Sequence, residues 1–381
     1  MAVEQSAPTR RPRGRDAEPV LPEPRGPLSR TVIEMLAGLP PAALAPPPRD
    51  AASADPYGDD LQLALHVCYE LHYRGFAGVA PDWEWDPELL RLRGALERVF
   101  LDALRTDTAP APSAPDGGGD ARAELEEVLG GLLVEPADGG VTGYLRDTGD
   151  RWQLLEHAAH RSVYHLKEAD PHAWVIPRLR GRAKTALVAV EHDEFGGGRA
   201  DRIHAGLYAD LLEDLGLDPS YGAYVDAAPA AMLATVNMMS CFGLHRSLRG
   251  ALVGHFAAAE ITTAPAARRM VPALERLGAG PRARLFYTEH IEADAVHEQV
   301  LRHDVIGGLL GAEPRLAADV TFGVRATGLL EDRLAAHLLG AWRADPPRSS
   351  LRRPLPEAAP EAAPEAAPEP RREPSDGCFP W

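Results

Sequence analysis

Apolar residues recur with the helical period of about 3.6 through most of the chain, and this pattern restricts the fold more than any other feature. In the segments that begin at Leu61, Glu88 and Ala230, apolar side chains fall at positions i, i+3, i+4 and i+7. The run ALVAV has the composition of a strand, but its length and the polar residues after it favour a helix over Lys184 to Phe195. We therefore expect an all-α fold, a helical bundle.

The two ends of the chain differ in composition from its middle. Residues 1–55 are rich in Pro, Ala and Arg, so they offer little apolar area to offset the entropy of ordering. We expect this segment to be disordered, apart from a short helix near Leu28 to Leu39. Residues 346–381 contain a Pro-Glu-Ala-Ala repeat and end in GCFPW, which predicts a second disordered tail. One helical domain is then expected over residues 56–345.

Charge and cysteine content exclude several classes of protein. The formal net charge of -16 opposes binding to nucleic acid and to anionic membrane surfaces. The three cysteines are far apart and form no C-x-x-C pair, so neither a disulfide framework nor a thiolate metal site is indicated. No apolar run is long enough to span a bilayer. We expect a cytoplasmic protein, and the near-exclusive use of arginine over lysine is typical of a GC-rich bacterial genome.

The strongest local pattern is EHIEADAVHEQVLRHD, which begins at Glu289. On a helix, His290, Asp294 and His297 lie at roughly 0°, 40° and 340° around the axis, so they share one face. Two imidazoles and a carboxylate are ligands that suit iron or manganese, whereas a structural zinc site would more often recruit cysteine. The alternative is a polar face exposed to solvent.

Three further residues can complete a site for two metal ions. Glu260 ends the apolar run GALVGHFAAAE, and burying a carboxylate there is costly unless a cation binds it. Glu194 and His204 are ten residues apart, and the three glycines that follow Phe195 can unwind the helix and bring both side chains to one centre. The alternative for the glycines is an ordinary interhelical loop.

The order Glu194, His204, Glu260, His290, Asp294, His297 resembles the ligand set of the haem-oxygenase-like di-iron oxidase and oxygenase superfamily. The sequence around these residues is similar as well, in the segments YHLKEADPHAW, DEFGGG, FGLHRSLRGALVGH and EHIEADAVHE. The resemblance covers roughly residues 60–340. The resemblance implies a haem-oxygenase-like helical bundle without haem. It also implies that all six residues act as metal ligands and as the catalytic centre, holding two Fe(II) ions.

The resemblance further implies an iron-dependent oxidoreductase that activates O2 as co-substrate and oxidises a small molecule, as in specialised metabolism. N-oxygenation, desaturation and oxidative C–C cleavage are the reaction types it suggests. It leaves room for an external electron donor and for a homodimer, and it implies neither nucleic acid nor membrane as a partner. Two other functions remain open: a non-catalytic iron-binding or interaction protein, and a metal-free enzyme on the same helical fold.

Overall fold

The computed structural model describes residues 15, 17–38, 53–110, 120–135 and 137–355, without the side chains of residues 292–295. Helices account for the regular structure of these residues, and no strand occurs among them, as expected. The α-helices are α1 Pro27–Ala37, α2 Asp59–Glu70, α3 Pro87–Asp107, α4 Ala121–Leu132, α5 Gly140–Asp147, α6 Arg151–His165, α7 Asp170–Ala173, α8 Gly181–Glu194, α9 His204–Asp214, α10 Ala230–Leu244, α11 Arg249–Arg276, α12 Pro281–Gln299, α13 Gly307–Ala312 and α14 Ala317–Trp342.

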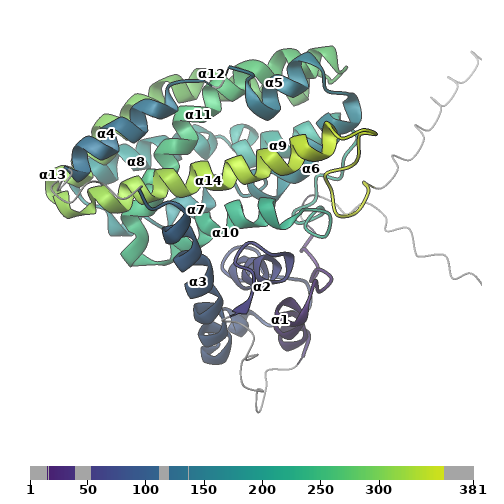
Figure 1. The fold of residues 1–381 in the computed structure, drawn as a ribbon, viewed down its shortest axis with the longest axis horizontal. Coiled ribbons are helices and arrows are strands. Elements are labelled where there is room, and N and C mark those ends of the chain that lie inside the picture. The colour runs from purple at the N-terminus through teal and green to yellow at the C-terminus, as the bar shows by residue number, and fades with distance from the viewer. Residues whose placement is uncertain (1–14, 16, 39–52, 111–119, 136, 356–381) are drawn as a thin grey trace, which may run out of the picture.

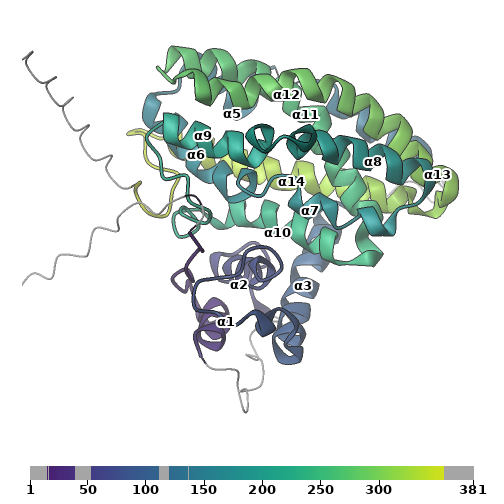
Figure 2. The same cartoon turned by 180° about the vertical axis from the view of Figure 1, so that it is seen from behind.

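The long helix α11 runs through the main body of the molecule and packs along both α12 and α14 (Figure 1). Helix α10 is buried on every side from Met232 to Gly243, as a helix without a polar face must be. Seen from behind, α8 and α9 lie beneath α12, while α1, α2 and α3 form a smaller group next to α10 (Figure 2). The predicted helix over ALVAV is confirmed as α8.

Two glycines allow α11 and α14 to approach closely. A Cβ added to Gly254 would lie 2.0 Å from the carbonyl oxygen of Val320, and one added to Gly323 would lie 1.9 Å from that of Ala251. Both obstacles are backbone atoms, which cannot rotate away. The helix pair therefore depends on residues without side chains at these positions.

We expect Gly323→Ala to lower the free energy of unfolding by about 3 kcal/mol, because the added methyl group must push α11 and α14 apart. Gly340→Ala is the matched control on the same helix, since a Cβ there meets nothing within 4 Å. The control should be neutral or slightly stabilising. Urea unfolding of both variants measures the difference, and equal stability of the two would contradict the packing argument.

Within residues 1–55, the segment expected to be disordered apart from one short helix, the structure describes residues 17–38. The short helix expected near Leu28 to Leu39 is confirmed as α1, whose apolar side chains Val32 and Leu36 are buried. Its N-terminus is capped from a distant helix, because Asp60 accepts hydrogen bonds from the backbone N–H groups of Leu28 and Ser29. Composition gave no sign of that partner. Residues 1–14, 16 and 39–52 lie outside the described residues.

The first residues of the predicted C-terminal tail contact the helical bundle. Ser350 is buried, and its N–H and hydroxyl both donate to Glu156, which accepts a third hydrogen bond from the indole N–H of Trp342. His160 contacts the same hydroxyl at 2.9 Å. Glu156 and His160 therefore hold Ser350 against α6, which is a structural role. Residues 356–381, with the repeat and GCFPW, lie outside the described residues.

None of the helices in the described part of the chain is both long and apolar enough to cross a bilayer.

Candidate metal centre

Two groups of buried ligand-type side chains lie side by side in the bundle. In each group, one ligand atom from every residue lies within 4.8 Å of the others. The first group contains Glu168, Glu194, His204 and His290, and the second contains Glu194, Glu260 and His297. Five of the six ligands expected from the sequence are thus brought together, and Glu194 belongs to both groups.

Short contacts within the first group show how closely its members converge. His204 Nδ1 lies 2.7 Å from Glu194 Oε2, and His290 Nε2 lies 3.7 Å from Glu168 Oε1. The rings of His204 and His290 are 4.4 Å apart between centroids. These residues come from four separate segments: the turn after α6, the end of α8, the start of α9, and α12.

In the second group, His297 Nδ1 faces two carboxylates, at 3.1 Å from Glu260 Oε2 and 3.7 Å from Glu194 Oε1. The two oxygens of Glu194 are therefore directed to different groups, Oε2 to His204 and Oε1 to His297. A carboxylate in this position can bridge two cations.

Asp294, the sixth expected ligand, lies within α12 between His290 and His297. Its side chain is outside the described residues, so its role stays a prediction. Directly after α12 the helix widens into a π-helical segment, Val300–Ile306. Such segments are frequent at functional sites.

The imidazoles are oriented through their other ring nitrogens. The Nδ1–H of His290 donates to the carbonyl of Phe286 at 2.7 Å, which directs Nε2 towards Glu168. His297 Nε2 lies 3.3 Å from Asp193 Oδ2, a contact that can orient the ring. Three other acids near the ligands pair with arginines: Glu289 with Arg202, Glu298 with Arg302, and Asp304 with Arg182.

Glu168 is the ligand-type residue that the sequence argument missed. It lies in a tight turn after α6, just before Ala169 at a positive φ of 73°, where no helical period marks its orientation. Burial alone would raise the pKa of Glu168, but His165 and His290 outweigh it and hold that pKa well below its usual value. His165 Nδ1 lies 2.8 Å from its carboxylate. The sequence feature that could have indicated Glu168 is the histidine three residues before it, His165.

The residues fit an iron site on chemical grounds. Three carboxylates, Glu168, Glu194 and Glu260, are each at most 8% exposed, and gathering them out of water is costly without a cation. Buried Glu168 Oε2 and Glu194 Oε1 also lack hydrogen-bond partners among the described residues. Oxygen and imidazole-nitrogen donors without thiolate suit iron or manganese.

A third group of ligand-type residues, Glu97, Cys241 and His245, is a weaker candidate. The guanidinium of Arg93 lies 3.2 Å from Glu97 and already supplies the positive charge. Burial raises the pKa of the Cys241 thiol, which disfavours the thiolate that a metal needs. The two groups that share Glu194 are therefore the better candidates for metal binding.

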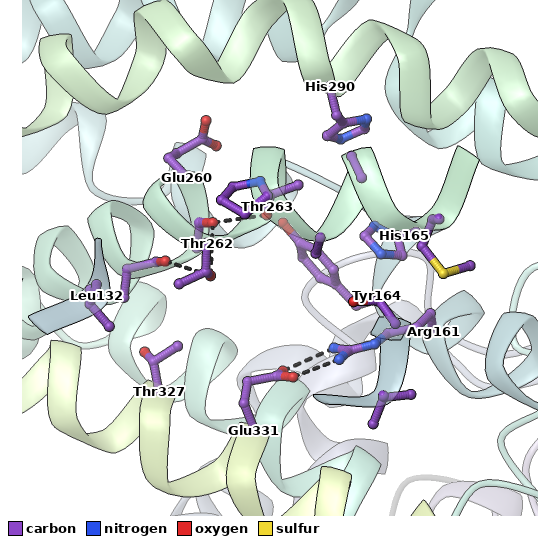
Figure 3. Close-up of a pocket in the computed structure, with 18 of the residues that line it drawn as sticks. Leu132, Arg161, Tyr164, His165, Glu260, Thr262, Thr263, His290, Thr327 and Glu331 are labelled. Atoms are coloured by element: carbon purple, nitrogen blue, oxygen red, sulfur yellow. Dashed lines mark hydrogen bonds and ion pairs between the residues drawn. The ribbon is translucent and has the colours of Figure 1, made fainter. Parts of the chain in front are cut away.

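A cavity of about 570 Å³ opens beside these groups. Figure 3 shows Glu260 and His290 on one side of it and Thr327 and Glu331 on the opposite side. Glu331 forms a bidentate ion pair with Arg161, in which the two guanidinium nitrogens lie 2.9 and 2.6 Å from the two carboxylate oxygens. The cavity is large enough for a small molecule that reaches from the candidate ligands to α14.

Fold and site together define the class: an all-α protein with a buried centre of carboxylates and imidazoles that is compatible with iron. A family model described as an iron-containing redox enzyme matches residues 155–332, which include every residue of the two groups. Over these residues the chain is similar to the iron-containing redox enzyme family, and the expected haem-oxygenase-like helical fold is confirmed.

A search of characterised proteins gives a more distant relative, the nitrosourea synthase of Streptomyces achromogenes subsp. streptozoticus. It is 25% identical to this chain over 223 residues, which is 58% of this chain and 46% of the relative. The chain therefore spans about half the length of that protein. Family and relative together support an oxidoreductase.

Proposed function

We propose that this protein is a non-haem di-iron oxidase or oxygenase that activates O2 to oxidise a small molecule. The observation that carries the proposal is the position of Glu194, whose two oxygens are directed to two adjacent groups of ligands. Two ferrous ions, when bound there, supply electrons and open coordination positions for dioxygen. Asp294 is proposed as a further ligand, from its place in α12.

The protein's own residues would hold and shield this centre. Glu168, His204 and His290 complete one iron site, and Glu260 with His297 completes the other. Phe286 and Tyr208 pack at 4.8 Å between ring centroids, and Phe286 is also 4.4 Å from the ring of His290. These buried rings keep bulk water from one side of the site, while the cavity admits substrate from the other.

The relative makes a nitrosourea, as its name states, so N-oxygenation is the first reaction type to test, before desaturation and C–C cleavage. Complete reduction of dioxygen to water takes four electrons. A substrate that gives up two electrons therefore leaves two to come from an external donor. The cytoplasmic location and a homodimer remain predictions beside this proposal.

The test is oxygen uptake by protein loaded with Fe(II) under argon. We expect uptake of about one O2 per two irons, with a transient visible absorption, and loss of both in His297→Ala. His303→Ala is the control, because His303 is exposed and lies six residues further along. Iron binding without uptake beyond that of free Fe(II) would favour the non-catalytic alternative. Absence of specific iron binding would favour the metal-free enzyme.

A further inference from the structure

Three of the histidines that line the cavity are buried and belong to neither group of candidate ligands: His157, His172 and His255. Each is at most 4% exposed. Each also has a ring nitrogen with no hydrogen-bond partner among the described residues, namely His157 Nδ1, both nitrogens of His172, and His255 Nε2. Buried polar atoms of this kind normally have partners, so a molecule in the cavity can supply one.

These imidazoles are uncharged at neutral pH. Burial lowers the pKa of His255 to about 4, and it lowers the pKa of His157 and His172 well below the usual value. A neutral imidazole has one N–H donor and one lone-pair acceptor. Which nitrogen carries the proton then decides what each ring can bind.

For His255 the hydrogen bonds decide the tautomer. The hydroxyl of Thr327 donates its single hydrogen to the carbonyl of Gly323 at 2.8 Å. The 2.8 Å contact between His255 Nδ1 and the same hydroxyl oxygen must then be a donation from Nδ1–H. Nε2 of His255 is therefore an acceptor, without a partner on the described residues.

The surroundings of His255 favour a donor over an anion. Glu331 places negative charge near the ring, since it acts on His255 electrostatically, and its own cation Arg161 is already engaged. His172 lies 5.2 Å from His255 between ring centroids and is held by stacking on Phe256 at 4.1 Å. A ligand carboxylate placed here would face His255 Nε2 with a second hydrogen-bond acceptor, and the two would repel. An N–H or O–H group would instead donate to Nε2.

We propose that His255 is a specificity-determining residue whose Nε2 accepts a hydrogen bond from an N–H or O–H group of the substrate. The proposal rests on the function proposed above, because it takes the cavity as the substrate site. Thr327 lies across the cavity from Glu260 and His290 (Figure 3). A substrate held by this donor group therefore extends from the His255–Thr327 pair towards the iron ligands, with its reactive part remote from the donor.

The test uses two isomers of equal size, 1-hexanol, which has an O–H donor, and 1-methoxypentane, which has none. Calorimetric titration of Fe(II)-loaded protein under argon should show about tenfold tighter binding of the alcohol, the worth of one hydrogen bond. His255→Leu should abolish this preference. Equal binding of the two isomers, binding of neither, or a preference for hexanoate would overturn the proposal.

A second variant tests the tautomer. Thr327→Val removes the acceptor of Nδ1–H, so both tautomers become populated and the preference for 1-hexanol should fall roughly two- to threefold. Thr321→Val is the matched control: Thr321 is buried on the same helix and makes the same hydroxyl bond to a carbonyl four residues earlier, but to Ala317. An unchanged preference in Thr327→Val, or an equal fall in both variants, would overturn the tautomer assignment.

The binding measurement requires no turnover, so its outcome is independent of the outcome of the oxygen-uptake test. Selective binding of 1-hexanol by a protein that takes up no oxygen would leave the role of His255 standing and refute the oxidase. Oxygen uptake without selectivity would do the reverse.

Discussion

Replacing Glu194 with alanine is expected to reduce bound iron from about two ions per chain to fewer than 0.5, because both groups of ligands lose a member at once. His204→Ala, which alters one group, should leave nearer one ion. Iron counted after anaerobic loading and gel filtration measures both variants. The contrast between them separates a bridging carboxylate from an ordinary ligand.

Glu191→Gln is the matched control for this prediction. Glu191 lies one turn before Glu194 on α8, is 2% exposed, and belongs to neither group of ligands. Burial, followed by the charges of Glu194 and Glu260, raises the pKa of Glu191 to about 9, so its carboxyl is protonated at neutral pH and glutamine imitates it. The control should keep both irons. Retention of two irons by Glu194→Ala would refute the shared ligand.

Replacing Lys167 with methionine is expected to lower the free energy of unfolding by roughly 3–5 kcal/mol. Lys167 is 1% exposed and pairs with the carboxylate of Glu70, which also accepts a hydrogen bond from Tyr221. Burial alone would raise the pKa of Glu70, but Lys167 and His66 outweigh it, so Glu70 is charged. Without Lys167, the charge of the Glu70 carboxylate stays buried and no ammonium group neutralises it.

Thermal unfolding measures this effect, and Tm should fall by roughly 6 °C or more. Lys184, the other lysine of the chain, provides the control variant Lys184→Met on α8, which should change Tm little. Lys167→Met combined with Glu70→Gln should recover part of the loss, because the second change removes the unpaired charge. Equal Tm values for the two single methionine variants would contradict the account.

The helices and most of the candidate site follow from short-range patterns. The period of 3.6 marks α2, α3 and α10 as helices, and the spacing of His290 and His297 sets both on one face of α12. Glu260 stands out because a carboxylate ends an apolar run. The resemblance to a known ligand order supplied the pairing of Glu194 with His204, which spacing alone left open.

What the sequence did not reveal depends on contacts between distant residues. Glu168 is oriented by a turn with a left-handed residue, Ala169, and by His165, so no periodic pattern exposes it. Helix α1 is held by a cap from Asp60, and the segment near Ser350 by hydrogen bonds to Glu156. Composition described both segments as tails, since it cannot report partners remote in the chain.

The most direct test of the central claim is anomalous diffraction at the iron edge from a crystal loaded with Fe(II) under argon. We predict two iron peaks, one among Glu168, Glu194, His204 and His290, and the other among Glu194, Glu260 and His297. A single peak, no peak, or a peak only at the group formed by Glu97, Cys241 and His245 would contradict the di-iron centre.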